Sequence, residues 1–310
     1  NWKLNFNSSF QNFDRDWIGT ERIQPATNGN WNRPLGRNKA VEQIFANQIS
    51  VQGNFKTGNI KHQLFTGIDT ENAFADAYTF RFFNSTTGTT ITTYDTVNIF
   101  DPSSYAEVNE GAIPASEITR IVNTETNRYG VYAQDLISFG EKFKALLGVR
   151  YSYQESKPIT NNIATNTVTE ETIRNDRAFS PKVGVIYQPT KNTSIFASYA
   201  NSFTPNTGVT IYNEAIKPSL IDQYEAGVKK EFWKGLLTTN VTLYHIVNSN
   251  LAQTAEFDAN GNVNTNTNVK SLSGETTSKG IEIDLIYKPI DALNIIAGYS
   301  YNDMRYTKTT

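Results

Sequence analysis

The alternation of tight turns with long polar segments is the feature of this chain that most constrains its fold. Tight turns occur at residues 56–59, 140–142, 190–193, 233–235 and 289–292, and long polar loops are predicted at residues 15–40, 84–117, 155–178, 204–221 and 249–278. Short turns at one end and long loops at the other are typical of a membrane-spanning barrel. The sequence therefore predicts an all-β chain that forms a transmembrane antiparallel up-and-down β-barrel.

The segments between the turns alternate apolar and polar residues, which is the signature of strands with one apolar face. Ala145, Leu147 and Val149 fall on one face of such a segment, and Lys144 and Arg150 fall on the other. Each segment has roughly ten residues, enough to cross a membrane as a tilted strand. Eleven strands are predicted, beginning near Trp2, Ala46, Ile60, Tyr129, Phe143, Phe179, Ser194, Asp222, Leu236, Lys279 and Leu293.

A soluble β-sandwich or lipocalin-like barrel would show the same alternation, but two details favour a membrane protein. The polar faces are rich in Gly, Ser, Asn and charged residues, as a water-filled interior requires. Aromatic residues gather near both ends of the strands, as in the two aromatic belts of membrane barrels. Phe139, Tyr187, Phe232, Trp233 and Tyr287 lie by the short turns, and Tyr151, Tyr153, Tyr199, Phe203 and Tyr301 lie towards the long loops.

The composition excludes several classes of function. The net charge of −2 gives no electrostatic footprint for nucleic acid, and the chain has no cysteine for a disulfide, nucleophile or metal site. His62 and His245 are the two histidines, and both are predicted on the apolar faces, without a carboxylate or second histidine at ligand spacing. No nucleophile elbow, phosphate-binding glycine loop or zinc motif is present. We therefore expect no enzyme activity, no cofactor and no metal site.

Eleven up-and-down strands cannot close on themselves with the even strand number of bacterial outer-membrane barrels, and an open edge in lipid leaves backbone groups unpaired. We therefore expect residues 1–310 to be a partial barrel domain that needs further strands. The first residues already read as a strand and the last read as the start of a loop, so the chain is predicted to come from the middle of a longer protein.

Six short motifs, in this order, give a resemblance to a known family. They are YGVYAQD at residues 129–135, LGVRY at 147–151, FSPKVGVIYQP at 179–189, QYEAGVK at 223–229, SKGIE at 278–282 and AGYSY at 297–301. Together they resemble the middle of TonB-dependent outer-membrane siderophore receptors, in particular the ferrichrome type.

The resemblance implies a barrel of about 22 strands with an N-terminal plug domain inside it. Such receptors sit in the outer membrane of Gram-negative cells, bind ferric siderophores from outside, and import them with energy from TonB through an N-terminal box. The expected partners are therefore a ferric siderophore, most fittingly a hydroxamate, the protein's own plug domain, TonB and outer-membrane lipid. Iron arrives already chelated, so the resemblance implies no protein ligands for it.

Aromatic residues near the outer loops are the candidate siderophore ligands. Residues 74–83 continue a strand into the longest loop, and Tyr78, Phe80 and Phe82 share one face of it as a candidate platform. The alternative is that these rings belong only to the upper aromatic belt, and the same alternative applies to Phe203. Further loop candidates are Tyr94, Phe100, Tyr105 and Tyr212, with Trp17 and Trp31 in the first loop.

Charged residues on the polar faces are predicted to contact the plug domain or one another, with ligand attraction as the alternative. Lys230 falls on the apolar face close to a turn, where its ammonium can reach the membrane interface. The polar-face charges are Arg150, Lys182, Glu225, Lys229, Glu231, Glu282 and Asp284.

Four other functions remain open at this stage. A passive porin would need an interior without a plug, and a TonB-dependent receptor for haem, cobalamin or glycan would share the same barrel. An outer-membrane protease or phospholipase would need His, Asp and Ser clustered at the mouth, which the predicted faces of both histidines disfavour. A soluble carbohydrate-binding β protein would not be found in membranes.

Overall fold

The computed structural model describes residues 1–20, 24–101, 103, 105 and 113–309, and most of them lie in strands. No helix in this described part is long and apolar enough to cross a membrane. One short 3-10 helix, η3, spans Trp233–Gly235. The strands are β1 (Trp2–Thr20), β2 (Asn30–Thr57), β3 (Ile60–Phe83), β4 (Thr90–Ile91), β5 (Thr93–Asn98), β6 (Ala115–Phe139), β7 (Phe143–Asn162), β8 (Thr167–Glu170), β9 (Arg174–Thr190), β10 (Thr193–Thr204), β11 (Ser219–Phe232), β12 (Leu237–Thr254), β13 (Lys270–Ile290) and β14 (Leu293–Lys308).

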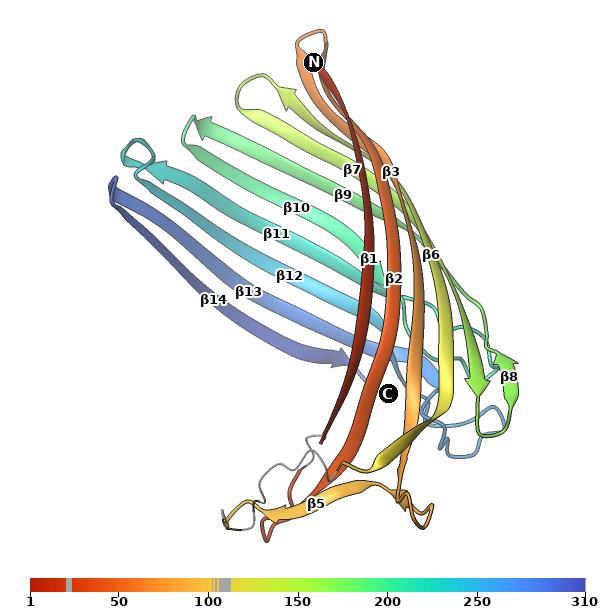
Figure 1. Cartoon of the computed structure of the whole chain (residues 1–310). Coiled ribbons are helices and arrows are strands. Elements are labelled where there is room, and N and C mark those ends of the chain that lie inside the picture. Colours follow the sequence, from red (N-terminus) through yellow and green to blue (C-terminus); the bar gives the residue numbers. More distant parts are fainter. Residues whose placement is uncertain (21–23, 102, 104, 106–112, 310) are drawn as a thin grey trace.

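Eleven of the described strands form one antiparallel sheet in chain order, as the sequence predicts. The order is β1-β2-β3-β6-β7-β9-β10-β11-β12-β13-β14, and β4, β5 and β8 pair with the outer parts of β3, β2 and β7 (Figure 1). All five predicted tight turns lie at one end of this sheet. Gly58, Gly140 and Gly235 have positive φ values of 61°, 72° and 91°, which a residue without a side chain adopts readily.

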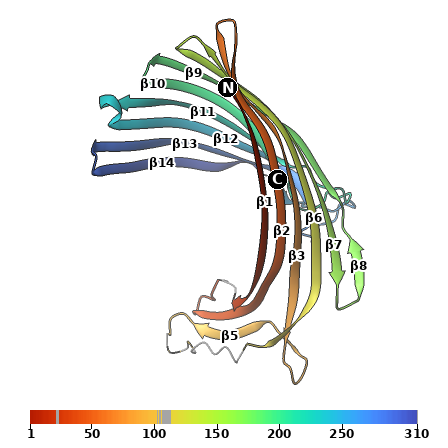
Figure 2. The same ribbon diagram turned by 45° about the horizontal axis from the view of Figure 1, so that its top comes forward.

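The sheet curls like part of a cylinder wall, so it has a concave and a convex face (Figure 2). Successive side chains point to opposite faces, so the register of each strand pair fixes which residues share a face. Gln134, Arg150 and Lys182 lie on the concave face, where they help to line a hollow of about 420 Å³. The alternating pattern then places Leu147, Val185 and the apolar residues two positions away from them on the convex face.

The convex face is apolar and open to its surroundings. Leu147, Val185 and Leu243 are 51%, 61% and 57% exposed, which would be costly for so many neighbouring side chains in water. Aromatic pairs border this apolar band at both ends, as predicted. Phe143 and Tyr187 stack at 4.7 Å near the short turns, and Tyr199 and Tyr224 pack at 5.1 Å near the opposite end. This arrangement is that of a membrane-facing barrel wall.

The strands are longer than predicted, and the predicted loops are correspondingly shorter. β2 has 28 residues and β6 has 25, so residues expected in the loops at 15–40, 84–117 and 155–178 continue the ladder. Alternation of apolar and polar residues stops where a strand leaves the membrane, because both of its faces then meet water. Backbone pairing does not need that alternation, so the strands continue beyond the point where the pattern ends.

Candidate functional site

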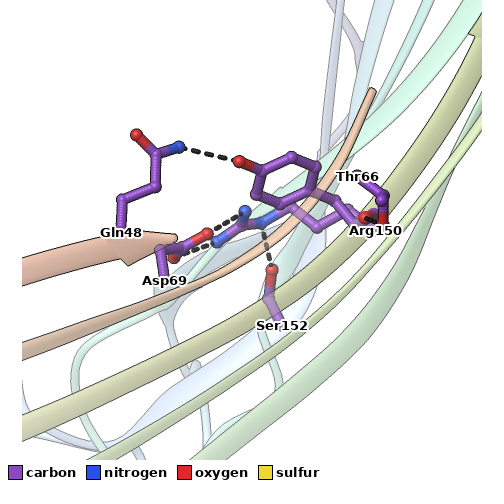
Figure 3. A network of polar contacts seen from close by, with 6 residues as sticks. Gln48, Thr66, Asp69, Arg150 and Ser152 are labelled. Carbon is purple, nitrogen blue, oxygen red and sulfur yellow. Dashed lines mark hydrogen bonds and ion pairs between the residues drawn. The ribbon is translucent and has the colours of Figure 1, made fainter. Parts of the chain in front are cut away.

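A polar network crosses four strands, β2, β3, β6 and β7, on the concave face (Figure 3). Arg150 on β7 donates two hydrogen bonds of 2.7 Å to the carboxylate of Asp69 on β3, and its Nε donates to Ser152 Oγ at 2.8 Å. Beside it, Gln48 on β2 donates to the hydroxyl of Tyr132 on β6 at 2.8 Å. The two parallel hydrogen bonds from Arg150 to Asp69 fix the orientation of the guanidinium, because guanidinium and carboxylate are both planar.

Glycines in the network's strands make these contacts possible. Arg150 reaches Asp69 across β6 at Gly130, where a Cβ would lie 2.1 Å from Arg150 Nη2. Tyr132 likewise lies over Gly67, where a Cβ would be 2.6 Å from the phenol oxygen. Large side chains therefore lie flat against the wall and leave the interior open. Sequence patterns do not predict this network, since Asp69 and Arg150 are 81 positions apart.

The charged residues predicted on the polar faces share the concave face but do not pair with one another. Glu225 accepts a hydrogen bond of 2.6 Å from Gln223, and Asp284 accepts one of 3.1 Å from Asn240. Lys229 lies over the ring of Phe196 at 5.5 Å. Within the described residues, the seven predicted charges form no ion pair with each other within 4.0 Å.

The predicted aromatic platform lies on the outer part of β3. Tyr78 and Phe80 carry cations from β2 over their rings, with Lys39 at 5.4 Å and Arg37 at 4.4 Å. Phe82 is only 4% exposed. Their positions in β3 place these three rings on the same face as Ile68, a convex-face residue. The role of this platform in ligand binding stays a prediction.

Another predicted residue, Tyr94 on β5, lies beside a cation in the connection between β3 and β6. Arg33 on β2 forms an ion pair with Asp95 on β5, and its guanidinium lies 5.4 Å from the ring of Tyr94. The hydrogen bond to Asp95 raises the pKa of Arg33, and the phenols of Tyr94 and Tyr105 add to that rise. Tyr94 therefore borders a paired cation, which the sequence did not predict, and Tyr105 is 45% exposed in the same connection.

The remaining predicted aromatic residues are dispersed. Phe100 and Tyr212 are exposed on separate outer loops, and Phe203 lies half-buried near the end of β10. Trp17 is exposed on β1, whereas Trp31 is half-buried on β2 and its indole nitrogen has no partner. No single pocket unites these side chains in the part of the chain that the structure describes, so their part in binding also stays a prediction.

Two neighbouring residues under the outer loops, the half-buried Arg174 and the buried Asp176, were missed by sequence reasoning. Arg174 on β9 donates to the carbonyl oxygens of Asn206 and, at 3.1 Å, Gly208, and so anchors the loop at residues 205–218. Asp176 beside it is 2% exposed, and burial raises the pKa of its carboxyl while Arg174 opposes the rise. Nothing in the local sequence distinguishes these residues from other loop charges.

The expectation that neither histidine has a nearby carboxylate was wrong for His62. Its Nδ1 lies 2.6 Å from Asp135 Oδ2, because β3 and β6 pair and bring together residues 73 positions apart. Phe55 stacks on the other side of the imidazole at 4.6 Å. His245 packs against Tyr224 at 6.2 Å. No group of three or more potential metal ligands exists among the described residues, so His62 and Asp135 form a pair only.

The family model described as TonB dependent receptor-like, beta-barrel matches residues 1–310, the whole chain. The chain belongs to the TonB-dependent receptor family. It is therefore part of a barrel of the Gram-negative outer membrane, and the convex face is the surface that meets lipid. The long connections then lie on the outer side and the short turns on the periplasmic side.

Similar proteins include several receptors for metal chelates. The metal-pseudopaline receptor CntO of Pseudomonas aeruginosa is 28% identical over 312 residues, covering 99% of this chain and 41% of that protein. The ferrichrome outer membrane transporter/phage receptor of Escherichia coli is 27% identical over 293 residues, covering 93% of this chain and 36% of that protein. The chain thus spans about two fifths of the length of these relatives.

Solved structures show the same fold. The siderophore receptor PiuA from Acinetobacter baumannii superposes with a TM-score of 0.82 at 20% identity, covering 99% of this chain and 45% of that one. BauA, the ferric preacinetobactin receptor from the same organism, superposes with a TM-score of 0.73 at 21% identity, covering 99% of this chain and 43% of that one. The observed strand order is therefore that of a receptor barrel.

Proposed function

We propose that the protein containing this chain is an outer-membrane receptor that binds ferric siderophores at its outer side and imports them with energy supplied through TonB. The observation that carries the proposal is the match of the whole chain to the receptor barrel family. The polar concave wall supports it, because a hydrophilic metal chelate needs a route bordered by hydrogen-bonding groups. A plug domain inside the barrel and a TonB-binding segment are part of the proposal.

The identity of the siderophore is a finer proposal. The ferrichrome-type resemblance favours a hydroxamate, while the relatives include receptors named for pseudopaline, ferrichrome and ferrioxamine B. Tyr78, Phe80, Phe82, Tyr94, Phe100, Tyr105, Phe203 and Tyr212 remain the proposed contacts at the outer side. Their aromatic rings would pack on the organic part of the chelate, and no protein atom would need to bind the iron itself.

The test uses the intact protein in a Gram-negative host that lacks its own siderophore receptors. Radiolabelled iron is supplied as hydroxamate, catecholate and carboxylate chelates, and uptake is measured with and without functional TonB. The proposal expects uptake of at least one chelate that stops when TonB is deleted. Equal uptake in both hosts would indicate a passive porin instead, and no uptake of any chelate would contradict the siderophore assignment.

A further inference from the structure

Three hollows on the concave face form one continuous groove along β3, β6, β7, β9 and β10. The uppermost, of about 420 Å³, shares Lys182 with a middle hollow of about 450 Å³. The middle hollow shares Lys144 and Gln188 with a lower one of about 500 Å³ at the short turns. The groove therefore runs from the Arg150 network down to the periplasmic mouth.

Cations occur at every level of this groove. Lys182 pairs in register with Gly148, four residues above the level of Lys144, or about 13 Å along the strand. Lys144 and Lys61 both flank Ser138, which places their backbones about 10 Å apart across three strands. The lower hollow adds the turn residues Lys142 and Lys191.

These lysines are not neutralised by neighbouring carboxylates. Lys61, Lys144 and Lys182 have no ion-pair partner within 4.0 Å among the residues that the structure describes. One acid, Glu225, borders the middle hollow and another, Glu141, borders the lower one, while none borders the upper. The groove thus has a net positive charge along its length.

The rest of the concave face does not share this charge. β13 presents Glu282 and Asp284 to the interior, at positions that pair with Thr242 and Asn240 of β12. The concave face is therefore positive along the groove and negative at β13. The positive charge is a feature of the strands that line the groove, not of the whole concave face. Apolar side chains such as Leu146 and Ile186 also line the middle hollow, and walls of low polarity strengthen the field of the lysines.

We infer that this lysine-lined groove is the interior path of the cargo, and that the cargo is a chelate with net negative charge, such as one that binds its metal through carboxylates or catecholates. Rows of Lys and Arg favour anions in other membrane pores for the same electrostatic reason. An uncharged hydroxamate chelate would gain nothing from these ammonium groups. The inference rests on the proposed function and replaces the hydroxamate that the ferrichrome-type resemblance favours with an anionic chelate.

The test compares charge variants of the intact receptor in the host described above. Lys144→Gln and Lys182→Gln are combined, and uptake is measured with an anionic ferric tris-catecholate and an uncharged ferric trihydroxamate. Lys230→Gln is the matched control, because Lys230 lies on the convex face over the ring of Phe232. A second double variant, Lys144→Arg with Lys182→Arg, keeps both positive charges but changes the shape of the side chains. It therefore tests whether uptake depends on the charge or on the shape of the lysines.

Wild-type receptor is expected to import the anionic chelate, with uptake about fivefold lower in the double Gln variant and nearly unchanged in the Arg and control variants. An equal fall for both chelates would overturn the inference and indicate that the lysines hold another part of the protein. Import of the uncharged chelate alone would overturn it too, while leaving the proposed function intact.

A second measurement separates the two proposals when neither chelate is transported. Purified receptor in detergent is titrated with radiolabelled ferric citrate, and the salt dependence of binding is recorded. Binding that weakens about fivefold in the double Gln variant, but not in Lys230→Gln, would support the groove as an anion site. Equal binding by wild type and both variants would overturn it.

Discussion

Replacement of Gly130 by alanine is expected to break the central ion pair of the barrel wall. An added Cβ would lie 2.1 Å from Arg150 Nη2 and 2.7 Å from Asp69 Oδ1, so the guanidinium must move off the carboxylate. Arg150 and Asp69 side chains are 40% and 30% exposed, so the pair lies between a surface pair and a buried one. We therefore expect a loss of about 1–2 kcal/mol in the free energy of unfolding.

Gly148→Ala is the matched control on the neighbouring strand. A Cβ there would meet Gln134 Cγ at 3.4 Å, which is an ordinary contact, so the expected change is within about 0.5 kcal/mol. The assay is denaturant unfolding of the intact protein in detergent, followed by tryptophan fluorescence. In an Arg150→Ala background, Gly130→Ala should cost much less, because the guanidinium is gone and the Asp69 carboxylate is then free to turn away from the added Cβ.

Two results would refute this reasoning. Equal destabilisation by Gly130→Ala and Gly148→Ala would mean that the cost comes from the backbone rather than from the ion pair. An equal loss of unfolding free energy in the Arg150→Ala background would mean that the Arg150 side chain is not what excludes a Cβ at Gly130.

Three further outcomes follow from the structure. His62→Ala leaves the carboxylate of Asp135 unpaired on the lipid-facing surface, and should lower the free energy of unfolding by about 1–2 kcal/mol, whereas the added change Asp135→Asn should recover most of it. Arg174→Ala removes the anchor of residues 205–218, and hydrogen exchange of that loop should quicken while exchange in β9 stays slow. Burial raises the pKa of Asp176 above its ordinary 3.8, so its ionised form destabilises the fold at neutral pH and that penalty disappears as pH falls. Asp176→Asn should therefore raise the unfolding midpoint at pH 7 but not below about pH 4, and an equal gain at both values would contradict the assignment.

The sequence by itself determined the strands, the tight turns and the two faces of the wall. Alternation of apolar and polar residues is a local property with a period of two, so it assigns Leu147 to one face and Arg150 to the other without any tertiary information. The turns at Gly58 and Gly140 are equally local, since they depend on residues that accept positive φ. The lengths of the strands were underestimated because backbone pairing continues outside the membrane, where alternation is no longer required.

Only the tertiary structure decided which distant residues meet. The contacts of Arg150 with Asp69 and of His62 with Asp135 depend on the register of strands that are far apart in sequence, and local patterns do not encode that register. The same holds for the lysine groove. Lys61, Lys144 and Lys182 look like unrelated polar-face residues in the sequence, and they border one continuous groove because three antiparallel pairings bring their strands side by side.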